Sequence, residues 1–294
     1  MLCGMARIAI IGGGSIGEAL LSGLLRAGRQ VKDLVVAERI PERAKYLASS
    51  YSVLVTSVSD AIEHATFVVV AVKPADVETV TGDLAAAATA AGSDSVEQVF
   101  VTVAAGVTTS YFESKLPAGT PVVRAMPNAA ALVGAGVTAL AKGRFVTPQQ
   151  LKEVSALFDA VGVVLNVPEQ QLDAVTAVSG SGPAYFFLLV EALVDAGVAV
   201  GLSRQVATEL TAQTLAGSTA MLLERMEQER PGAGEPAGLR VDTTALQLRA
   251  SVTSPGGTTA AALRELEKGG FRAVVDAAVQ AAKSRSEQLR ITSE

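Results

Sequence analysis

The spacing of hydrophobic residues changes between the two halves of the chain. Up to residue 167, short apolar runs alternate with helical periodicity, as expected for buried parallel strands joined by helices. From residue 169, apolar residues recur only at helical spacing. The expected strands are 7–11, 34–37, 53–55, 67–72, 99–103, 121–124 and 163–167. The expected later helices lie near 184–200, 204–228, 243–252, 259–268 and 271–290. The pattern predicts an α/β fold, with a doubly wound sheet in residues 1–167 and an all-α domain in 168–294.

The first strand leads directly into a glycine-rich turn. Gly12, Gly14 and Gly17 have G-x-G-x-x-G spacing, with Ser15 and Ile16 between them, and an amphipathic helix follows. In a dinucleotide site the first glycine allows the tight turn, the second lets the backbone approach the pyrophosphate, and the third lets the helix pack on the strand. The helix N-terminus then favours the anion. The motif predicts a Rossmann-type cofactor site; the alternative is an ordinary tight turn.

The end of the second strand bears on the choice of cofactor. Glu38 lies about twenty residues beyond Gly17, where an acidic side chain would bind the adenosine ribose and favour NAD. Arg39 could instead receive a 2′-phosphate and favour NADP. Alternatively, both residues begin a solvated turn into the helix led by Pro41. The residues themselves leave this choice open.

Two further strand ends should lie on the cofactor's side of the sheet. In a doubly wound sheet, ligands bind outside the carboxyl ends of the strands, which places Lys73 and Ala105 there. For Lys73, an ordinary surface lysine is an equal alternative. Helix starts are expected at Ser59, as an N-cap, at Ser110 with Glu113, as a capping box, and at Thr147–Gln150, as a second capping box.

Composition excludes several classes of chemistry. The 294 residues include one cysteine, Cys3, and one histidine, His64, so an internal disulfide is impossible. A metal cluster or a Ser-His-Asp triad also has almost no residues from which to form, and we expect no metal. His64 is expected at a solvated helix end. A bound cofactor should therefore supply the difficult chemistry.

Charge and hydropathy limit the classes of partner that the chain is expected to bind. The net charge is −5 and no basic run indicates nucleic acid. The apolar segment 184–202 carries Glu191 and Asp195, so a membrane span is not expected. No export signal is apparent, which favours the cytoplasm. The apolar, small-residue-rich helical half is expected to bury much of its surface against a second subunit.

Several segments together resemble the pyrroline-5-carboxylate reductases, which form proline in the last step of its synthesis. SGSGPAY and VTSPGGTT are signatures of that family rather than general nucleotide-binding turns. The resemblance follows the order of the chain over nearly its whole length. The matching segments are GGGSIG (12–17), VAVKP (70–74), AAGVT (104–108), RAMPN (124–128), AVSGSGPAY (177–185), VTSPGGTT (252–259) and FRAVV (271–275).

The resemblance implies a substrate site at the second glycine turn. Family members bind the substrate carboxylate on backbone N–H groups, here those of Gly257, Thr258 and Thr259, and a threonine hydroxyl, here of Thr259, binds the ring nitrogen. A helix start after glycines suits an anion. Thr258 could also be the N-cap of the helix 259–268. A family carboxylate, usually Glu, corresponds to Asp242, which could equally cap the helix 243–252.

Two departures from the family pattern affect this assignment. Thr243 follows Asp242 where the family has His-Pro, and Ala129 follows Asn128 where the family has Asn-Thr-Pro. The expected catalytic residues are Thr259 and Asp242. The expected cofactor-binding residues are Gly12, Gly14, Ser15, Ile16, Gly17, Glu38, Arg39, Ser59, Val72, Lys73, Pro74, Ala105 and Asn128.

The resemblance also implies an activity and an assembly. The expected reaction is hydride transfer to the imine of 1-pyrroline-5-carboxylate from NADPH, with NADH as the alternative donor. The helical half would be a dimerisation domain, and dimers could assemble into rings. A β-hydroxyacid dehydrogenase is one alternative, but residues 169–224 lack the lysine that such enzymes use as a general acid. A non-catalytic NAD(P) sensor is the other.

Overall fold

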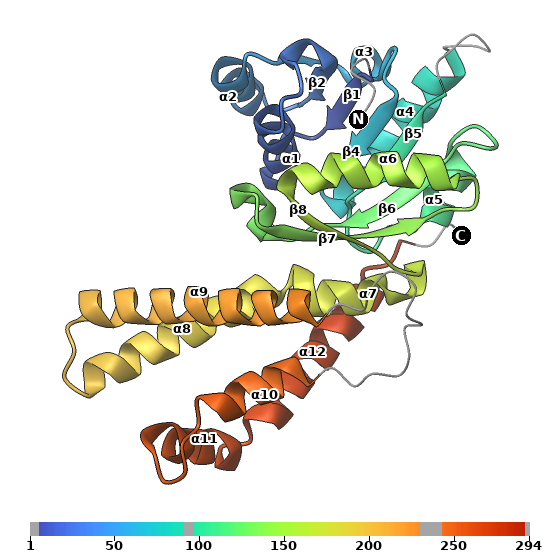
Figure 1. Ribbon diagram of the computed structural model, residues 1–294. Helices are drawn as coiled ribbons and strands as arrows, with labels where there is room; N and C mark the ends of the chain where they lie inside the picture. Colours follow the sequence, from blue (N-terminus) through green and yellow to red (C-terminus); the bar gives the residue numbers. More distant parts are fainter. Residues whose placement is uncertain (1–5, 91–96, 230–242, 292–294) are drawn as a thin grey trace. The chain divides into compact units, whose positions relative to one another are not determined.

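The computed structural model describes residues 6–90, 97–229 and 243–291 (Figure 1). The chain forms two compact units, one of residues 1–183 with 279–294 and one of residues 184–278. The domain boundary expected between residues 167 and 168 stays a prediction.

The helices and strands largely follow the order expected from the sequence. The strands are β1 (Ile8–Ile11), β2 (Leu34–Ala37), β3 (Leu54–Thr56), β4 (Phe67–Val70), β5 (Val99–Thr102), β6 (Val122–Met126), β7 (Gly136–Lys142) and β8 (Gly162–Asn166). The helices are α1 (Ser15–Arg26), α2 (Pro41–Tyr51), α3 (Val58–Ile62), α4 (Val77–Ala90), α5 (Thr109–Lys115), α6 (Pro148–Phe158), α7 (Leu172–Val175), α8 (Gly182–Ala199), α9 (Arg204–Gln228), α10 (Thr244–Ser251), α11 (Thr258–Lys268) and α12 (Phe271–Gln288). Short 3₁₀ segments are η1 (Val31–Asp33), η2 (Pro74–Asp76), η3 (Ala129–Val133), η4 (Asp159–Val161) and η5 (Glu169–Gln171).

Within the described residues the strands form one eight-stranded sheet in the order β3-β2-β1-β4-β5-β6-β7-β8. The seven expected strands are all present, and the doubly wound α/β fold is confirmed. β7 was not expected; it lies antiparallel to β6 and parallel to β8. Its sequence, GVTALAK, is rich in small residues and follows a glycine-containing turn, so the pattern did not separate it from a loop. The chain order reverses between β1 and β4, where such sheets bind ligands.

Alternate residues of β1, β2, β4, β5 and β6 enter two separate hydrophobic cores. Ile8 and Ile10 of β1 pack with α1 and α6 on one face of the sheet, whereas Ala9 and Ile11 pack with α3, α4 and α5 on the other. Figure 1 shows helices on both faces. Because side chains alternate along a strand, both faces must be apolar, which explains the uninterrupted hydrophobic runs.

Two expected helix starts are shifted by two residues. The N-cap of α3 is Ser57, whose hydroxyl accepts the Asp60 N–H, and not Ser59. The N-cap of α5 is Thr108, which accepts the Tyr111 N–H, so the capping box expected at Ser110 is wrong. In both cases neighbouring hydroxyl residues offered more than one cap. The capping box at Thr147 and Gln150 is confirmed.

The segment expected as a break between residues 179 and 183 instead contains a π-helical turn. Residues Thr176–Gly180 form this turn after α7, and α8 begins at Gly182. A Cβ on Gly180 would lie 2.8 Å from the Cε atom of Met126, so the π turn approaches the end of β6 closely.

The second compact unit is helical (Figure 1). Its long helices α8 and α9 carry many exposed apolar side chains. Phe186 is 55% exposed, Phe187 68% and Leu188 67%. Exposure on this scale is unusual for a monomer surface. The helices expected from residue 184 onward are all present, each within two residues of its predicted bounds.

Candidate functional site

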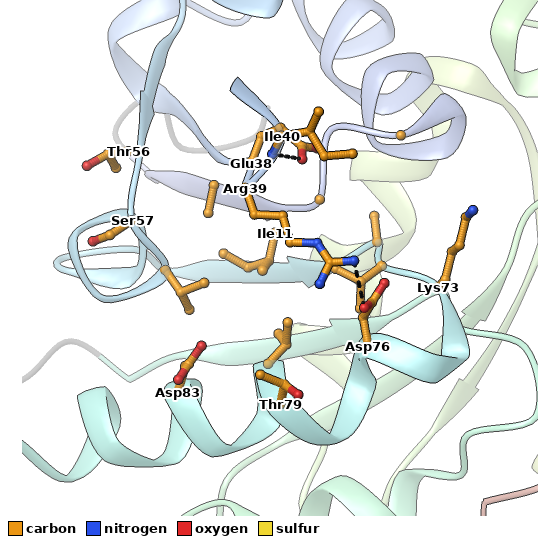
Figure 2. Close-up of a pocket in the computed structure, with 17 residues that line it drawn as sticks. Ile11, Glu38, Arg39, Ile40, Thr56, Ser57, Lys73, Asp76, Thr79 and Asp83 are labelled. Carbon is orange, nitrogen blue, oxygen red and sulfur yellow. Dashed lines mark hydrogen bonds and ion pairs between the residues drawn. The ribbon is translucent and has the colours of Figure 1, made fainter. Parts of the chain in front are cut away.

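A cleft of about 340 Å³ lies at the carboxyl ends of β1, β2, β3 and β4. It occupies the point where the chain order of the sheet reverses, the place at which doubly wound folds bind nucleotides. The residues that line it are Ile11, Gly12, Gly14, Ala37, Glu38, Arg39, Ile40, Thr56, Ser57, Val58, Ala71, Val72, Lys73, Asp76, Thr79, Val80 and Asp83. Figure 2 shows that these residues come from several elements around the cleft.

The three glycines of the first turn each meet a different steric requirement. Gly12 has φ +102°, and a Cβ there would lie 2.7 Å from the carbonyl oxygen of Ala71. A Cβ on Gly14 would meet nothing within 4 Å, so this side of the turn is open. A Cβ on Gly17 would lie 2.0 Å from the carbonyl oxygen of Gly12. These are the requirements of a turn that binds a dinucleotide at a helix N-terminus.

The N-terminus of α1 has no side-chain cap. Gly14 is the N-cap residue, and the first backbone bond of the helix runs from the Glu18 N–H to the Gly14 carbonyl. Ser15 is exposed and Ile16 is half-buried. The first N–H groups of the helix therefore stay available to an anion.

Glu38 contacts the glycine turn. One carboxylate oxygen accepts the Gly13 N–H at 2.9 Å, and the other accepts the Ile40 N–H at 2.8 Å. Glu38 lines the cleft, and its two oxygens are engaged by backbone donors. The carboxylate thus fixes the turn against the end of β2, a role that sequence spacing did not reveal.

Arg39 extends across the cleft to Asp76 of η2. Its Nη2 atom lies 2.9 Å from Oδ1 of Asp76, and its side chain is 75% exposed (Figure 2). In the same view the side chain of Lys73 points away from this pair. Arg39 is therefore a cation at the mouth of the cleft.

Sequence reasoning missed several polar residues that line the cleft. Thr56 ends β3, Ser57 follows it, and Thr79 and Asp83 lie on α4. None belongs to a motif with a distinctive spacing; the sheet brings them together. The position of Thr56 at a strand end was the one available signal.

Some of the expected cofactor residues do not line this cleft. Ser59 bonds the hydroxyl of Ser57 at 3.0 Å, and Pro74 begins η2 beside Lys73. Asn128 accepts the Val137 N–H at 3.2 Å and so connects the end of β6 to β7. Ala105 is half-buried in a turn closed by the Val107 N–H and the Ala104 carbonyl.

The second glycine turn precedes α11. The Gly257 N–H donates to the Ser254 carbonyl at 3.1 Å, and Gly256 has φ +70°. The N-cap of α11 is Gly257, with no side-chain cap, so the alternative that Thr258 is the N-cap is wrong. Thr259 is half-buried in the first turn. The uncapped start leaves N–H groups that suit a carboxylate.

The structure gives fewer contacts for the other residues singled out from the sequence. Asp242 lies outside the described residues, and α10 begins at Thr244 with Thr243 as its N-cap. The side chain of His64 is 76% exposed, in agreement with a solvated helix end. Among the described residues, no group of three or more His, Cys, Asp and Glu side chains could hold a metal ion.

Comparisons with known proteins agree with this geometry. Residues 169–289 match the family model "Pyrroline-5-carboxylate reductase dimerisation", and residues 7–110 match "NADP oxidoreductase coenzyme F420-dependent". The chain is 84% identical to the pyrroline-5-carboxylate reductase of Mycobacterium tuberculosis, with 100% of each chain covered. The corresponding protein of Mycobacterium leprae is 80% identical over the same extent.

The chain belongs to the pyrroline-5-carboxylate reductase family. It is accordingly an NAD(P)-dependent oxidoreductase. Solved structures of the family have the same fold: the Coxiella burnetii enzyme has a TM-score of 0.85 at 33% identity, covering 98% of this chain and 100% of that one. The Plasmodium falciparum enzyme, solved with NADP bound, has a TM-score of 0.79 at 27% identity, covering 97% and 98%.

Membership of the reductase family accounts for the apolar helical surface. The dimerisation match includes α8 and α9, whose exposed phenylalanine and leucine side chains suit a homodimer interface. The continuous helical stretch 169–199 is also long and apolar enough to cross a membrane, by length and composition only. One such helix is weak support for a span, and this stretch opens the dimerisation segment.

Proposed function

We propose that the chain reduces 1-pyrroline-5-carboxylate to L-proline with hydride from NADPH, in the last step of proline biosynthesis. The observation that carries this proposal is the 84% identity, over the full length, to a pyrroline-5-carboxylate reductase. The uncapped starts of α1 and α11 support it, since they supply one anion site for the cofactor and one for a substrate carboxylate.

When bound, the cofactor supplies the hydride that the imine carbon accepts. The N–H groups of Thr258 and Thr259 hold the substrate carboxylate, joined by that of Gly257 once it leaves the Ser254 carbonyl, and the Thr259 hydroxyl bonds the ring nitrogen. An imine that binds already protonated accepts hydride readily and needs no strong general acid. This agrees with a chain whose one histidine, His64, is exposed. Orientation of the substrate supplies most of the rate enhancement.

The role of Thr259 has a direct test. Thr259→Ala should lower kcat/KM for pyrroline-5-carboxylate about tenfold, because one hydrogen bond to a charged nitrogen is lost. Thr259→Ser should stay within about threefold of the wild type because it keeps the hydroxyl. Loss of nicotinamide absorbance, with NADPH and pyrroline-5-carboxylate mixed with the purified chain, measures both.

Ser251→Ala is the matched control, since it removes an exposed hydroxyl from the preceding helix, α10. Full activity of Thr259→Ala would remove the hydroxyl from the mechanism. A wild-type chain that binds NADPH and does not turn over pyrroline-5-carboxylate would contradict the proposed reaction itself. That result would favour a sensor or an oxidoreductase with another substrate.

A preference for NADPH over NADH is the second part of the proposal. Both oxygens of Glu38 are engaged by backbone N–H groups, whereas Arg39 presents an exposed guanidinium to the cleft. A 2′-phosphate offers a guanidinium a stronger partner than a carboxylate at the protein surface does. The phosphate would therefore replace Asp76 as the partner of Arg39.

Arg39→Ala should raise the KM for NADPH about tenfold, as expected for the loss of one charge-assisted contact to phosphate. The KM for NADH should stay within about twofold, because NADH has no 2′-phosphate. Steady-state kinetics with each cofactor measures the two values on the same preparation. An equal loss for both cofactors would contradict a phosphate contact.

Three further parts of the proposal concern the substrate, the cofactor and the assembly. Asp242 is proposed to lie beside the ring nitrogen. Val72, Lys73, Pro74, Ala105 and Asn128 are proposed to contact the cofactor together with the glycine turn. Dimers are proposed to assemble into a ring, in the cytoplasm. Analytical ultracentrifugation of the purified chain measures the assembly.

A further inference from the structure

Gly13, the residue between the first two motif glycines, is held by two side chains of opposite charge. Its N–H donates to Glu38 at 2.9 Å, and its carbonyl oxygen accepts Nε of Arg43 at 2.6 Å. Gly13 is buried, and a Cβ there would lie 2.2 Å from Cδ1 of Leu47 on α2. The middle of the turn is therefore fixed against α2.

Arg43 is itself fixed by a cluster between α1 and α2. Its guanidinium pairs with Glu18 of α1 and lies 5.0 Å from the ring centre of Tyr46. The other oxygen of Glu18 accepts the hydroxyls of Tyr46 at 3.0 Å and Tyr51 at 2.7 Å. Three side chains, those of Glu18, Tyr46 and Tyr51, thus set the position of the Arg43 guanidinium, which in turn bonds one backbone carbonyl.

Glu18 and Tyr51 keep their protonation states at neutral pH. Burial alone would raise the pKa of Glu18, but hydrogen bonds from Tyr51, Arg43 and Tyr46 outweigh it and hold that pKa below its usual value. Burial and the hydrogen bond to Glu18 raise the pKa of Tyr51 to about 12. Tyr51 therefore remains a donor and Glu18 remains an acceptor.

The position of the Gly13 carbonyl determines where the next N–H points. The Gly13–Gly14 peptide bond is trans, so its C=O and N–H groups point in opposite directions. Because Arg43 holds the carbonyl toward α2, the Gly14 N–H points away from α2. Gly14 is exposed and lines the cleft, and its N–H has no hydrogen-bond partner among the described residues.

We propose that Arg43 is a positioning residue for the cofactor, which orients the Gly14 N–H toward the pyrophosphate by holding the Gly13 carbonyl. This role rests on the proposed use of the glycine turn by NADPH. Arg43 does not line the cleft and acts through the backbone of the turn. It differs in this respect from Arg39, which lines the cleft and is proposed to bind the 2′-phosphate.

The test measures cofactor binding directly, by titration of NADPH and of NADH into Arg43→Ala. Both dissociation constants should rise about tenfold and by the same factor, because the two cofactors share the pyrophosphate. Arg43→Lys should recover part of the affinity, since an ammonium can still donate to the Gly13 carbonyl. At saturating cofactor, kcat and the KM for pyrroline-5-carboxylate should stay within about twofold of the wild type.

Arg26→Ala is the matched control: it removes the same charge from the end of α1, where Arg26 bonds Ser22 and makes no contact with the turn. Unchanged dissociation constants in Arg43→Ala, or a loss confined to NADPH, would overturn the positioning role. If Arg43→Ala does not fold, the same titration is made with Arg43→Lys. Wild-type affinity of Arg43→Lys for both cofactors, together with a loss of kcat that Arg26→Ala does not share, would then overturn the positioning role. A wild-type chain that binds neither cofactor would instead contradict the proposed function.

Discussion

Gly17→Ala is expected to weaken the binding of NADPH about 100-fold and to lower the free energy of unfolding by about 3 kcal/mol. An alanine normally stabilises a helix interior relative to glycine by about 1 kcal/mol. At this position the added Cβ would lie 2.0 Å from the carbonyl oxygen of Gly12 and 3.3 Å from Ile10. Backbone cannot move aside as a flexible side chain can, so the steric effect outweighs the helix propensity.

Relief of this clash requires α1 to move away from β1. Because the same displacement moves the Gly14 N–H and the uncapped start of α1, it removes donors that the pyrophosphate needs. Affinity and stability should therefore decrease together. By contrast, Gly14→Ala meets nothing within 4 Å and should lower affinity with little effect on stability.

The two effects are measured by titration of NADPH and by chemical denaturation at one protomer concentration, since the stability of a dimer depends on concentration. Gly82→Ala is the matched control, because Gly82 is an exposed position of α4 with open space around it. That control should bind NADPH normally and be slightly more stable. A Gly17→Ala chain that matched it in both measurements would show that the turn tolerates a side chain here.

Arg290→Ala is expected to lower the free energy of unfolding by about 2–3 kcal/mol. This loss is at the low end of the values for a broken buried ion pair, because Arg290 is partly exposed to solvent. The side chain of Asp173 on α7 is 2% exposed, whereas that of Arg290 is 41% exposed. Asp173 accepts Nε of Arg290 at 2.9 Å and the Ser286 hydroxyl at 2.7 Å. Without Arg290, the buried carboxylate loses its strongest partner.

This contribution depends on pH in a definite direction. Burial alone would raise the pKa of Asp173, but hydrogen bonds from Ser286 and Arg290, with the charges of Arg290 and Arg124, hold it below its usual value. The stabilisation is therefore complete above the unfolded pKa of aspartate, about 4, and is lost as pH falls through the lower folded pKa. The wild type and the variant should converge in stability on acidification.

Denaturation series from neutral to acidic pH test both statements. Lys283→Ala is the control, because it breaks an ion pair with Glu287 that lies on the same helix, α12, and is about 40% exposed on each side. Such a pair should contribute less than about 1 kcal/mol. Equal stabilities of the two variants at neutral pH, or a difference that grows on acidification, would contradict the role of Asp173.

The Asp173 cluster also shows what a sequence pattern cannot reveal. Asp173 and Arg290 are separated by more than a hundred positions, and neither belongs to a spaced motif. The neighbouring Ile291 N–H donates to the Gly106 carbonyl at 3.0 Å, in the turn after β5 that contains Ala105. Ile291 therefore contacts an expected cofactor loop, and only packing creates that contact.

The expected site was predicted best where backbone geometry restricts the residue type. Gly12 and Gly17 are required by close approaches of the Ala71 and Gly12 carbonyls, and such requirements leave a readable spacing. Ribose binding by Glu38 was one of the alternatives that the spacing left open, and the spacing gave no sign that its carboxylate accepts two backbone N–H groups. No sequence pattern identifies Arg43, because its partner is a backbone carbonyl, which any residue supplies.

The sequence by itself determined the alternation of strands and helices, the glycine turn at the start of α1, the helical second half and the family. Each of these depends on local periodicity or on residues at fixed spacing. Tertiary structure alone decided the insertion of β7 between β6 and β8, the cleft that gathers Arg39, Thr56 and Asp83, and the bond from Arg43 to Gly13. These depend on which strand ends and helix faces become neighbours, and that is set by packing across the whole sheet.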